Sequence, residues 1–377
     1  MNFSILTSLL VLLSFFLSST LLSAQNSRSV KKITHPGILH TKEGLENMRD
    51  GVAQKKQPFL QGFEELKKDP RSSSNYTVLG GFKEVGRAPN IKSDEHTSDA
   101  DAAHQNAVMW VITGDQAHAD KAIEILNAWS STLKVISGDA AILSAGISGI
   151  KFAAAAEILR YTDSGWKKED IEQAEEMFTE VYYPVCKDMA DFANGNWALA
   201  ALQTVVAIAI FTDDTRALNR GFRWFYRGKD NARLTHYIIN KEGQCQESGR
   251  DQNHTILGLG YLATVAEMGW NQGLDLYGAK DNRILAGFEY TASYNLGNDV
   301  PFEETTDTTG KYHHTSISDI QRGRLSGRPV FQMVYNHYKN RKGMDCPYTE
   351  QVVKQERPEG PGLYGDHIGF GTIYFTQ

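Results

Sequence analysis

The densest cluster of polar residues in the chain runs from position 246 to position 254 and opens an otherwise apolar stretch. Within it, Glu247, Arg250 and His254 are three and four residues apart, so a helix starting here would place them on one face. Carboxylate, guanidinium and imidazole groups bind charged partners and exchange protons. A solvated helix start with an internal Glu–Arg pair is the plainer explanation. The apolar continuation favours a buried helix whose polar end faces a cavity.

A second group, Asn194-Gly195-Asn196-Trp197, precedes another apolar segment. Asn194 lies where a helix N-cap is expected, and capping alone accounts for it. Asn196 beside Trp197 fits carbohydrate binding, because an indole ring stacks on a sugar while a carboxamide bonds a carboxylate or hydroxyl group.

Weaker candidates lie in other parts of the chain. Tyr290 and Tyr294 are four residues apart and would share a helix face, and at least one is expected to pack in the core. Tyr312 and His313 lie in a Gly- and Thr-rich stretch that is typical of a loop, where binding residues are frequent. Upstream, the pair His104-Gln105 lies in another predicted helix. We take these residues as candidate substrate ligands.

The elements that must position these residues are helices. In residues 115–133, apolar residues recur at spacings of three and four, and Asp115 is placed to cap the start. Further helices are predicted at 99–112, 138–161, 197–211, 214–227, 247–268, 282–296 and 329–340. Their short connections favour antiparallel hairpins, and no fixed repeat period supports a solenoid. We therefore predict an all-α fold, an (α/α) toroid or incomplete α/α barrel, with minor β elements at 369–375 and 237–240.

The N-terminus predicts a secretory signal peptide. An apolar run over 5–22 ends in Leu22-Ser23-Ala24, which favours a signal peptide at residues 1–24, cleaved after Ala24, over a membrane anchor. No other stretch is expected to approach the roughly 20 apolar residues that cross a bilayer. We expect residues 25–377 to form a single catalytic domain that is secreted or periplasmic.

Charge and motifs restrict the partners. A formal charge of -6 argues against nucleic acid, and an acidic substrate would require positive charge concentrated in a cleft. The three cysteines allow one bridge, but three buried thiols are favoured. Neither a metal-ligand motif nor a phosphate-binding or nucleophile-elbow motif is present, so we expect no metal and no cofactor.

Taken together, these motifs resemble the alginate-lyase superfamily, with polysaccharide lyase family 38 as the closest branch. The resemblance covers nearly all of residues 25–377 and rests on 99–107, 113–115, Trp129, 194–197, 246–254, 273–277, 289–290, 294–295 and 369–372. It implies a toroid with a substrate groove at one end and metal-independent β-elimination of a uronic-acid polymer, alginate and preferably polymannuronate.

The resemblance also implies residue roles. In related lyases an Asn, a His and an Arg neutralise the uronate carboxylate while a Tyr transfers protons, and Asn196, Arg250 and His254 match the first three types. Two departures matter, because the relatives often have His at the position of Trp197 and can carry Tyr at that of His254. The tyrosine must then come from elsewhere. Tyr294 is slightly favoured over Tyr312, and Tyr290 is third.

Three other functions remain open. The first is a lyase for glucuronan or another glucuronate polymer. The second is a glycoside hydrolase on the same toroid, pairing Glu247 or Asp251 with Glu289 or Glu303. The third is an oligosaccharide-binding protein without catalysis. The oligomeric state is not predicted.

Overall fold

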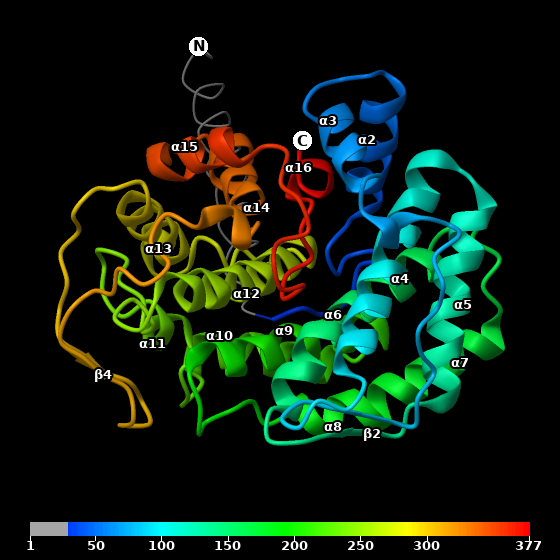
Figure 1. Cartoon of the computed structure of the whole chain (residues 1–377), viewed down its shortest axis with the longest axis horizontal. Coiled ribbons are helices and arrows are strands. Elements are labelled where there is room, and N and C mark those ends of the chain that lie inside the picture. Colours follow the sequence, from blue (N-terminus) through cyan, green and yellow to red (C-terminus); the bar gives the residue numbers. More distant parts are fainter. Residues whose placement is uncertain (1–28) are drawn as a thin grey trace, which may run out of the picture.

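The computed structural model describes residues 29–377, so the predicted signal peptide lies outside the described residues. Helices are arranged in an inner layer and an outer layer around a ring (Figure 1). The inner layer contains α4 (Ser93–Thr113), α6 (Ala141–Arg160), α9 (Gly195–Phe211) and α12 (Gln252–Asn271). The outer layer contains α5 (Gln116–Thr132), α7 (Lys168–Met177), α10 (Thr215–Arg227) and α13 (Ala279–Asn295). This confirms the predicted toroid of helical hairpins.

Burial separates the two layers. Nearly every residue of α6, α9 and α12 is buried, because each inner helix has neighbours on all sides. By contrast, α10 buries one face only, including Leu218, Phe222 and Phe225. Around the ring, α4 packs on α6, α6 on α9 and α9 on α12.

The two ends of the chain close the ring. After α14 (Phe331–Tyr335), a π-helical segment η4 (Asn336–Arg341) and α15 (Pro347–Glu356), the chain ends near α16 (Gly371–Tyr374). This last helix packs against α14 on one side and on the other against α3 (Phe59–Leu66), which follows α2 (Lys42–Ala53). The contact with α3 is so close that a Cβ on Gly62 would lie 2.7 Å from the backbone nitrogen of Ile373.

Short elements connect the helices. Strand β1 (Glu84–Gly86) pairs in parallel with β2 (Val135–Ser137), and β3 (Thr305–Thr306) pairs antiparallel with β4 (His313–His314). The remaining short helices are η1 (Pro70–Ser72), η2 (Phe178–Tyr182), α8 (Tyr183–Cys186), α11 (Leu234–Tyr237) and η3 (Leu325–Gly327).

Several local predictions need correction. The helix predicted from position 247 begins at Gln252, because the Asp251 side chain accepts from the His254 backbone N–H and caps it. The predicted strand at 369–375 contains the helix α16, and the one at 237–240 is reduced to a single bridge between Ile238 and Cys245. The three cysteines are free and buried, as predicted.

Helix α6 also corrects the prediction about apolar stretches. By length and composition it is apolar enough to cross a membrane. Within the fold nearly all of it is buried, which is the environment of a core helix.

Candidate active site

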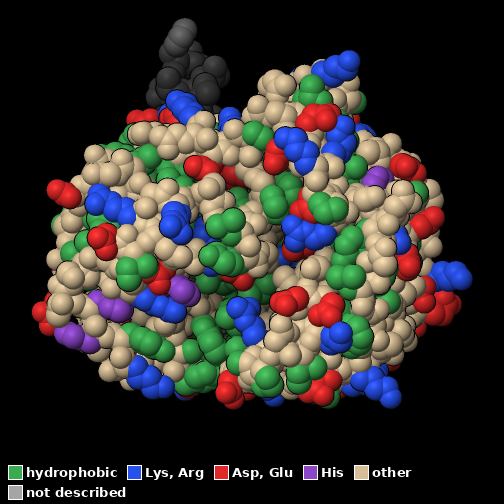
Figure 2. All heavy atoms as spheres, viewed as in Figure 1, with side chains coloured by type: hydrophobic (Ala, Val, Ile, Leu, Met, Phe, Trp, Pro, Cys, Tyr) green, Lys and Arg blue, Asp and Glu red, His purple; other side chains and the backbone are tan. Residues whose placement is uncertain are grey.

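A cavity of about 930 Å³ opens at one end of the ring. It is lined by the N-terminal residues of all four inner helices, represented by Ser93 of α4, Leu143 of α6, Asn196 of α9 and Asn253 of α12. Loops around positions 87, 320 and 364 supply further lining residues. In Figure 2 this face of the molecule is hollowed near its centre, with acidic and basic side chains around the hollow.

A hydrogen-bonded cluster of five side chains lies at this cavity. Asn196 donates from Nδ2 to Oε1 of Glu247 at 2.6 Å, and Oε2 of the same carboxylate accepts from Arg250 at 3.3 Å. Arg250 also contacts Nε2 of His254 at 3.1 Å, and His254 Nδ1 lies 2.7 Å from Oδ2 of Asp251. The segment from position 247 to position 254 therefore turns back on Asn196 at the start of α9.

These contacts indicate the tautomer of His254. A guanidinium can only donate, so Nε2 of His254 accepts from Arg250 and carries no proton. Its proton is then on Nδ1 and is donated to Asp251. In this arrangement the lone pair of Nε2 points at Arg250, and it can accept a proton once Arg250 releases it.

The two carboxylates of the cluster differ in their surroundings. Burial raises the pKa of Glu247, whose side chain is fully enclosed, although the nearby charge of Arg250 opposes this. Burial also acts to raise the pKa of Asp251, but hydrogen bonds from the side chain and backbone of His254 outweigh it and hold that pKa below its usual value. Asp251 is therefore the ionised partner that orients the imidazole.

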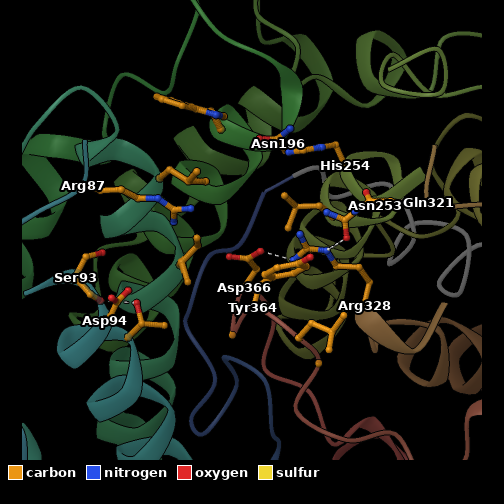
Figure 3. Close-up of a pocket in the computed structure, with 18 of the residues that line it drawn as sticks. Arg87, Ser93, Asp94, Asn196, Asn253, His254, Gln321, Arg328, Tyr364 and Asp366 are labelled. Carbon is orange, nitrogen blue, oxygen red and sulfur yellow. Dashed lines mark hydrogen bonds and ion pairs between the residues drawn. The ribbon is translucent and has the colours of Figure 1, made fainter. Parts of the chain in front are cut away.

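Three arginines line the cavity. Arg71 pairs with Asp69 and Asp101, and Arg328 pairs with Asp366. Arg87 has no hydrogen bond or ion pair from its side chain to any residue within 29–377, and Figure 3 shows it reaching into the cavity across from Asn196 and His254. Arg87 is therefore the cavity arginine whose charge is available to a ligand.

The helix ends add to this positive field. The N-terminus of an α-helix carries a partial positive charge, and unpaired backbone N–H groups there bind anions. Four such ends meet at this cavity. A chain with a formal charge of -6 thus presents a local environment that favours an anionic ligand.

The structure brings together part of the predicted site. Asn196, Trp197 and His254 line the cavity, and Trp197 packs edge-on against Phe192 at a ring distance of 6.2 Å. Arg250 and Glu247 are not among the lining residues, but Glu247 bonds to Asn196 and the partly exposed Arg250 contacts His254.

None of the three candidate tyrosines lines the cavity. The Tyr290 hydroxyl donates to the carbonyl of Pro301 at 2.7 Å, and Tyr294 is buried under the guanidinium of Arg322. Tyr312 lies in the β3–β4 hairpin, where its carbonyl accepts from Asp307. Their positions give the favoured Tyr294 no direct access to a sugar in this cavity.

The remaining predicted ligands also lie elsewhere. His104 and Gln105 are buried within α4, where His104 contacts His40 at 3.3 Å and Gln105 donates to Asp69 at 3.2 Å. His313 points away, toward Glu304 at 3.3 Å. Its neighbour His314 packs instead on Gly249, so closely that a Cβ there would lie 2.3 Å from the histidine Cβ.

Sequence reasoning missed residues that come from loops. Arg87, Tyr364 and Asp366 line the cavity but lie in no polar cluster of the sequence, and Arg328 is one of several arginines that the sequence does not distinguish. Tyr364 is the cavity-lining tyrosine within residues 29–377, and the Arg328 guanidinium lies 4.9 Å from its ring centroid. The one sequence feature that could have marked Tyr364 as a site residue is its position next to Gly365 and Asp366.

Within residues 29–377, no group of three or more His, Cys, Asp or Glu side chains is arranged to hold a metal ion. The polar side chains at the cavity include arginines, amides, one imidazole and the carboxylates of Asp94, Asp251 and Asp366. Such donors and cations can bind a carboxylate, and an imidazole can accept a proton.

Comparison with solved structures identifies the fold. The chain is similar to alginate lyase A1-III from Sphingomonas species A1, with a TM-score of 0.66 and 14% identity over 92% of this chain and 98% of that one. It is also similar to an alginate lyase from Bacteroides ovatus, with a TM-score of 0.63 and 14% identity over 90% and 99%. The toroid is thus the fold of solved alginate lyases.

The sequence identifies the family. The model of the alginate lyase family matches residues 54–302, so the chain belongs to this family and is a polysaccharide lyase. No curated protein sequence matches it. A tyrosine-to-phenylalanine variant of the Sphingomonas enzyme, solved in complex with a tetrasaccharide, has a TM-score of 0.65 and 14% identity over 92% of this chain and 97% of that one.

Proposed function

We propose that the enzyme cleaves alginate, preferably polymannuronate, by β-elimination that leaves a 4,5-unsaturated uronate end. The observation that carries the proposal is the position of His254, whose ring contacts Asp251 and Arg250, with Asn196 at a cavity bordered by Arg87 and four helix N-termini. The tetrasaccharide complex of a related alginate lyase supports a polymeric substrate of this kind.

The first requirement is to acidify the proton at C5. That proton becomes removable when hydrogen-bond donors stabilise the charge that develops on the neighbouring carboxylate. Asn196 uses one N–H for Glu247 and has a second to donate, while Arg250 can exchange its contact with His254 for the substrate. Binding of the carboxylate therefore also frees Nε2 of His254.

The second requirement is proton transfer. His254 Nε2 takes the C5 proton, the C5–H electrons form the C4=C5 double bond, and the C4–O4 bond breaks. We assign protonation of the departing O4 to Tyr364. It is the tyrosine that lines this cavity, and the guanidinium of Arg328 lies beside its ring. We expect Phe replacements of Tyr294, Tyr290 and Tyr312 to retain most of the activity.

The stereochemistry of the elimination ranks the candidate polymer substrates. Mannuronate and glucuronate differ only at C2, so in both the C5 proton and O4 lie on the same face, whereas guluronate is inverted at C5. His254 and Tyr364 both line this cavity, and a base and an acid acting on the same face of the sugar would suit same-face elimination. We therefore rank a glucuronate polymer second and polyguluronate third.

Hydrolysis fits this geometry less well. Glu289 accepts from the backbone N–H groups of Tyr348 and Thr349 at the start of α15, and neither it nor Glu303 lines the cavity. Glu247 is enclosed and Asp251 is bonded to His254. A hydrolase requires an acid and a base facing the sugar from both sides.

Digestion of polymannuronate, glucuronan and polyguluronate tests the proposal. The absorbance of the unsaturated product should rise fastest with polymannuronate, with EDTA present or absent. New reducing ends without absorbance would indicate a hydrolase. Binding without turnover would indicate an oligosaccharide-binding protein, and loss in EDTA restored by calcium would overturn metal independence.

We also propose that the enzyme acts outside the cytoplasm. The apolar run ending at Ala24 supports this proposal. N-terminal sequencing of the protein recovered from its native host should begin at Gln25. A full-length chain in the cytoplasmic fraction would contradict it.

A further inference from the structure

Lys151 is a buried cation in the middle of the apolar helix α6, and its side chain is 1% exposed. A buried ammonium is tolerated only when charged or polar partners replace water. Its partners are Oδ1 of Asp101 on α4, at 2.5 Å, and the carbonyl oxygen of Gly365. The lysine thus links two inner helices to the loop near the C-terminus.

Asp101 is shared between two cations. Its second oxygen accepts from Arg71 at 2.7 Å, and Arg71 is held in turn by Asp69. Burial raises the pKa of Asp101, while the charges of Lys151 and Arg71 oppose that shift. Asp101 is the partner of Lys151 on a neighbouring helix, and the carbonyl of Gly365 is its partner in the loop.

Gly365 stands between two residues that line the cavity, Tyr364 and Asp366. Its φ of +62° is in the left-handed region, and a Cβ there would lie 3.2 Å from Oδ2 of Asp101. Glycine therefore permits the close approach of this loop to the buried network.

The other side of the loop is tied to the catalytic wall. Asp366 pairs with Arg328, which donates from Nε to Oδ1 of Asn253 at 2.9 Å, next to His254 (Figure 3). The tip itself packs little, since Leu363 is 72% exposed and Tyr364 is 53% exposed. Apart from the bond from the Leu363 N–H to the carbonyl of Gly327, the position of Tyr364 thus depends on what holds residues 365 and 366.

We propose that Lys151 is a positioning residue, which holds Tyr364 at the cavity through the carbonyl of Gly365. This inference rests on the proposed function, in which Tyr364 protonates the leaving oxygen. Lys151 does not touch substrate and acts through the loop. Its removal should misplace the tyrosine, and a displacement on the order of 1 Å can cost about a hundredfold in rate.

A double-mutant cycle tests the proposal with the complete enzyme on polymannuronate. Lys151→Met should lower kcat about ten- to a hundredfold in the wild-type background but change it little in a Tyr364→Phe background. An equal loss in both backgrounds, an unchanged kcat for Lys151→Met, or full activity of Tyr364→Phe would each overturn it.

Gly365→Ala provides a second route if Lys151→Met fails to fold. It disturbs the same contact from the loop side and leaves the buried charges paired. The matched control is Gly343→Ala, because Gly343 has a similar φ of +65° but a Cβ there would have nothing within 4 Å. Only Gly365→Ala should lower kcat, and equal activity of the two variants would contradict the proposal.

Hydrogen exchange provides a readout that does not depend on turnover. In Lys151→Met, amides of residues 362–366 should exchange faster while those of α9 stay protected. If wild-type enzyme cleaves no uronate polymer, the proposed function fails, yet this measurement still shows whether Lys151 holds the loop. Unchanged exchange in the loop would refute the anchoring itself.

Discussion

The polar groups at the two ends of the inner helices differ in whether they have partners within the protein. At the cavity end, Asn196 and Arg87 retain hydrogen-bonding groups without a protein partner among residues 29–377. At the other end, residues 30–40 cross the ring and bond to the helix ends. There the Glu157 carboxylate accepts from the backbone N–H groups of Gly37 and Ile38 at 3.0 and 2.7 Å.

The difference follows from the polarity of the helices. Glu157 lies near the C-terminal end of α6, where the helix dipole disfavours a negative charge, so the carboxylate needs His35 and backbone donors. Gln272, after α12, is equally occupied with the backbone of Thr34 and Gly37. The closed end uses its polar groups for folding, and the open end keeps them for an anionic ligand.

The largest expected effect separates catalysis from folding. His254→Gln should reduce kcat by about a thousandfold with little change in Tm, because it removes the proposed proton acceptor from a partly exposed position. Glu157→Ala should do the reverse. Breaking its buried pair should cost about 3 kcal/mol of unfolding free energy and leave the activity of the folded fraction intact.

Chemical denaturation and initial rates on the same preparations measure both quantities. An active His254→Gln enzyme would contradict the base assignment. A Glu157→Ala enzyme that is stable but inactive would contradict the division between the two ends.

The second effect concerns Arg250. Arg250→Ala should lower kcat/KM by about a hundredfold, since a donor acting on transition-state charge is worth about 3 kcal/mol. The loss should exceed any effect on stability, although Arg250 also bonds to Glu247 and His254. Thermal unfolding beside turnover separates the two roles, and a fall in Tm with normal kcat/KM would make Arg250 structural.

Local signals explain which helices were predictable. Asp115 and Asp214 cap α5 and α10 at or next to the predicted boundaries, because an Asp before an amphipathic run specifies a helix start by itself. The start of α12 was missed because the polar cluster contains its own cap, Asp251, four residues inside the predicted range. In 369–375 the alternating pattern suggested a strand, but packing between α3 and α14 favours the helix α16.

The site was predictable where one segment carries its residues. Asn196 and His254 could be placed at the cavity from the sequence, because each lies in a polar cluster at the start of an apolar helix. Arg87 and Tyr364 come from loops far apart in the sequence, and only ring closure brings them to one cavity. Tyr290 and Tyr294 lie away from the cavity, because a helical spacing of four also describes core packing, and both side chains are buried.

A smaller effect is expected from Arg87 at the open end. Its backbone is fixed, since its N–H donates to Ser137 and its carbonyl accepts from Ala140, both at 3.1 Å, while its side chain has no partner within residues 29–377. Arg87→Met should raise KM for polymannuronate about tenfold with little change in kcat, as expected for uniform binding of a carboxylate. The difference from wild type should shrink as salt is added.

The matched control is Arg216→Met. Arg216 lies in the first turn of α10, and its replacement should leave KM unchanged. A KM for Arg87→Met that equals that of wild type at low salt would exclude Arg87 from binding.

The smallest effect is a pH dependence at the closed end. His35 contacts Glu157 and Asp213, both at 2.9 Å, and stacks on Tyr161. Burial acts to lower the pKa of His35, but the hydrogen bonds to the two carboxylates outweigh it and the pKa is raised. A raised pKa means that protonation of His35 favours the folded state.

The sign determines the pH window. The stabilisation is fully present below the unfolded pKa of about 6.5 and is lost as pH rises through the higher folded value. The difference in unfolding free energy between wild type and His35→Gln should therefore be largest near pH 6 and shrink toward about pH 8, by roughly 1 kcal/mol for one pKa unit. Denaturation at several pH values measures it, with His254→Gln as the control from the open end. If the difference in unfolding free energy stays constant from pH 6 to pH 8, His35 stabilises the fold as a neutral hydrogen-bonding group.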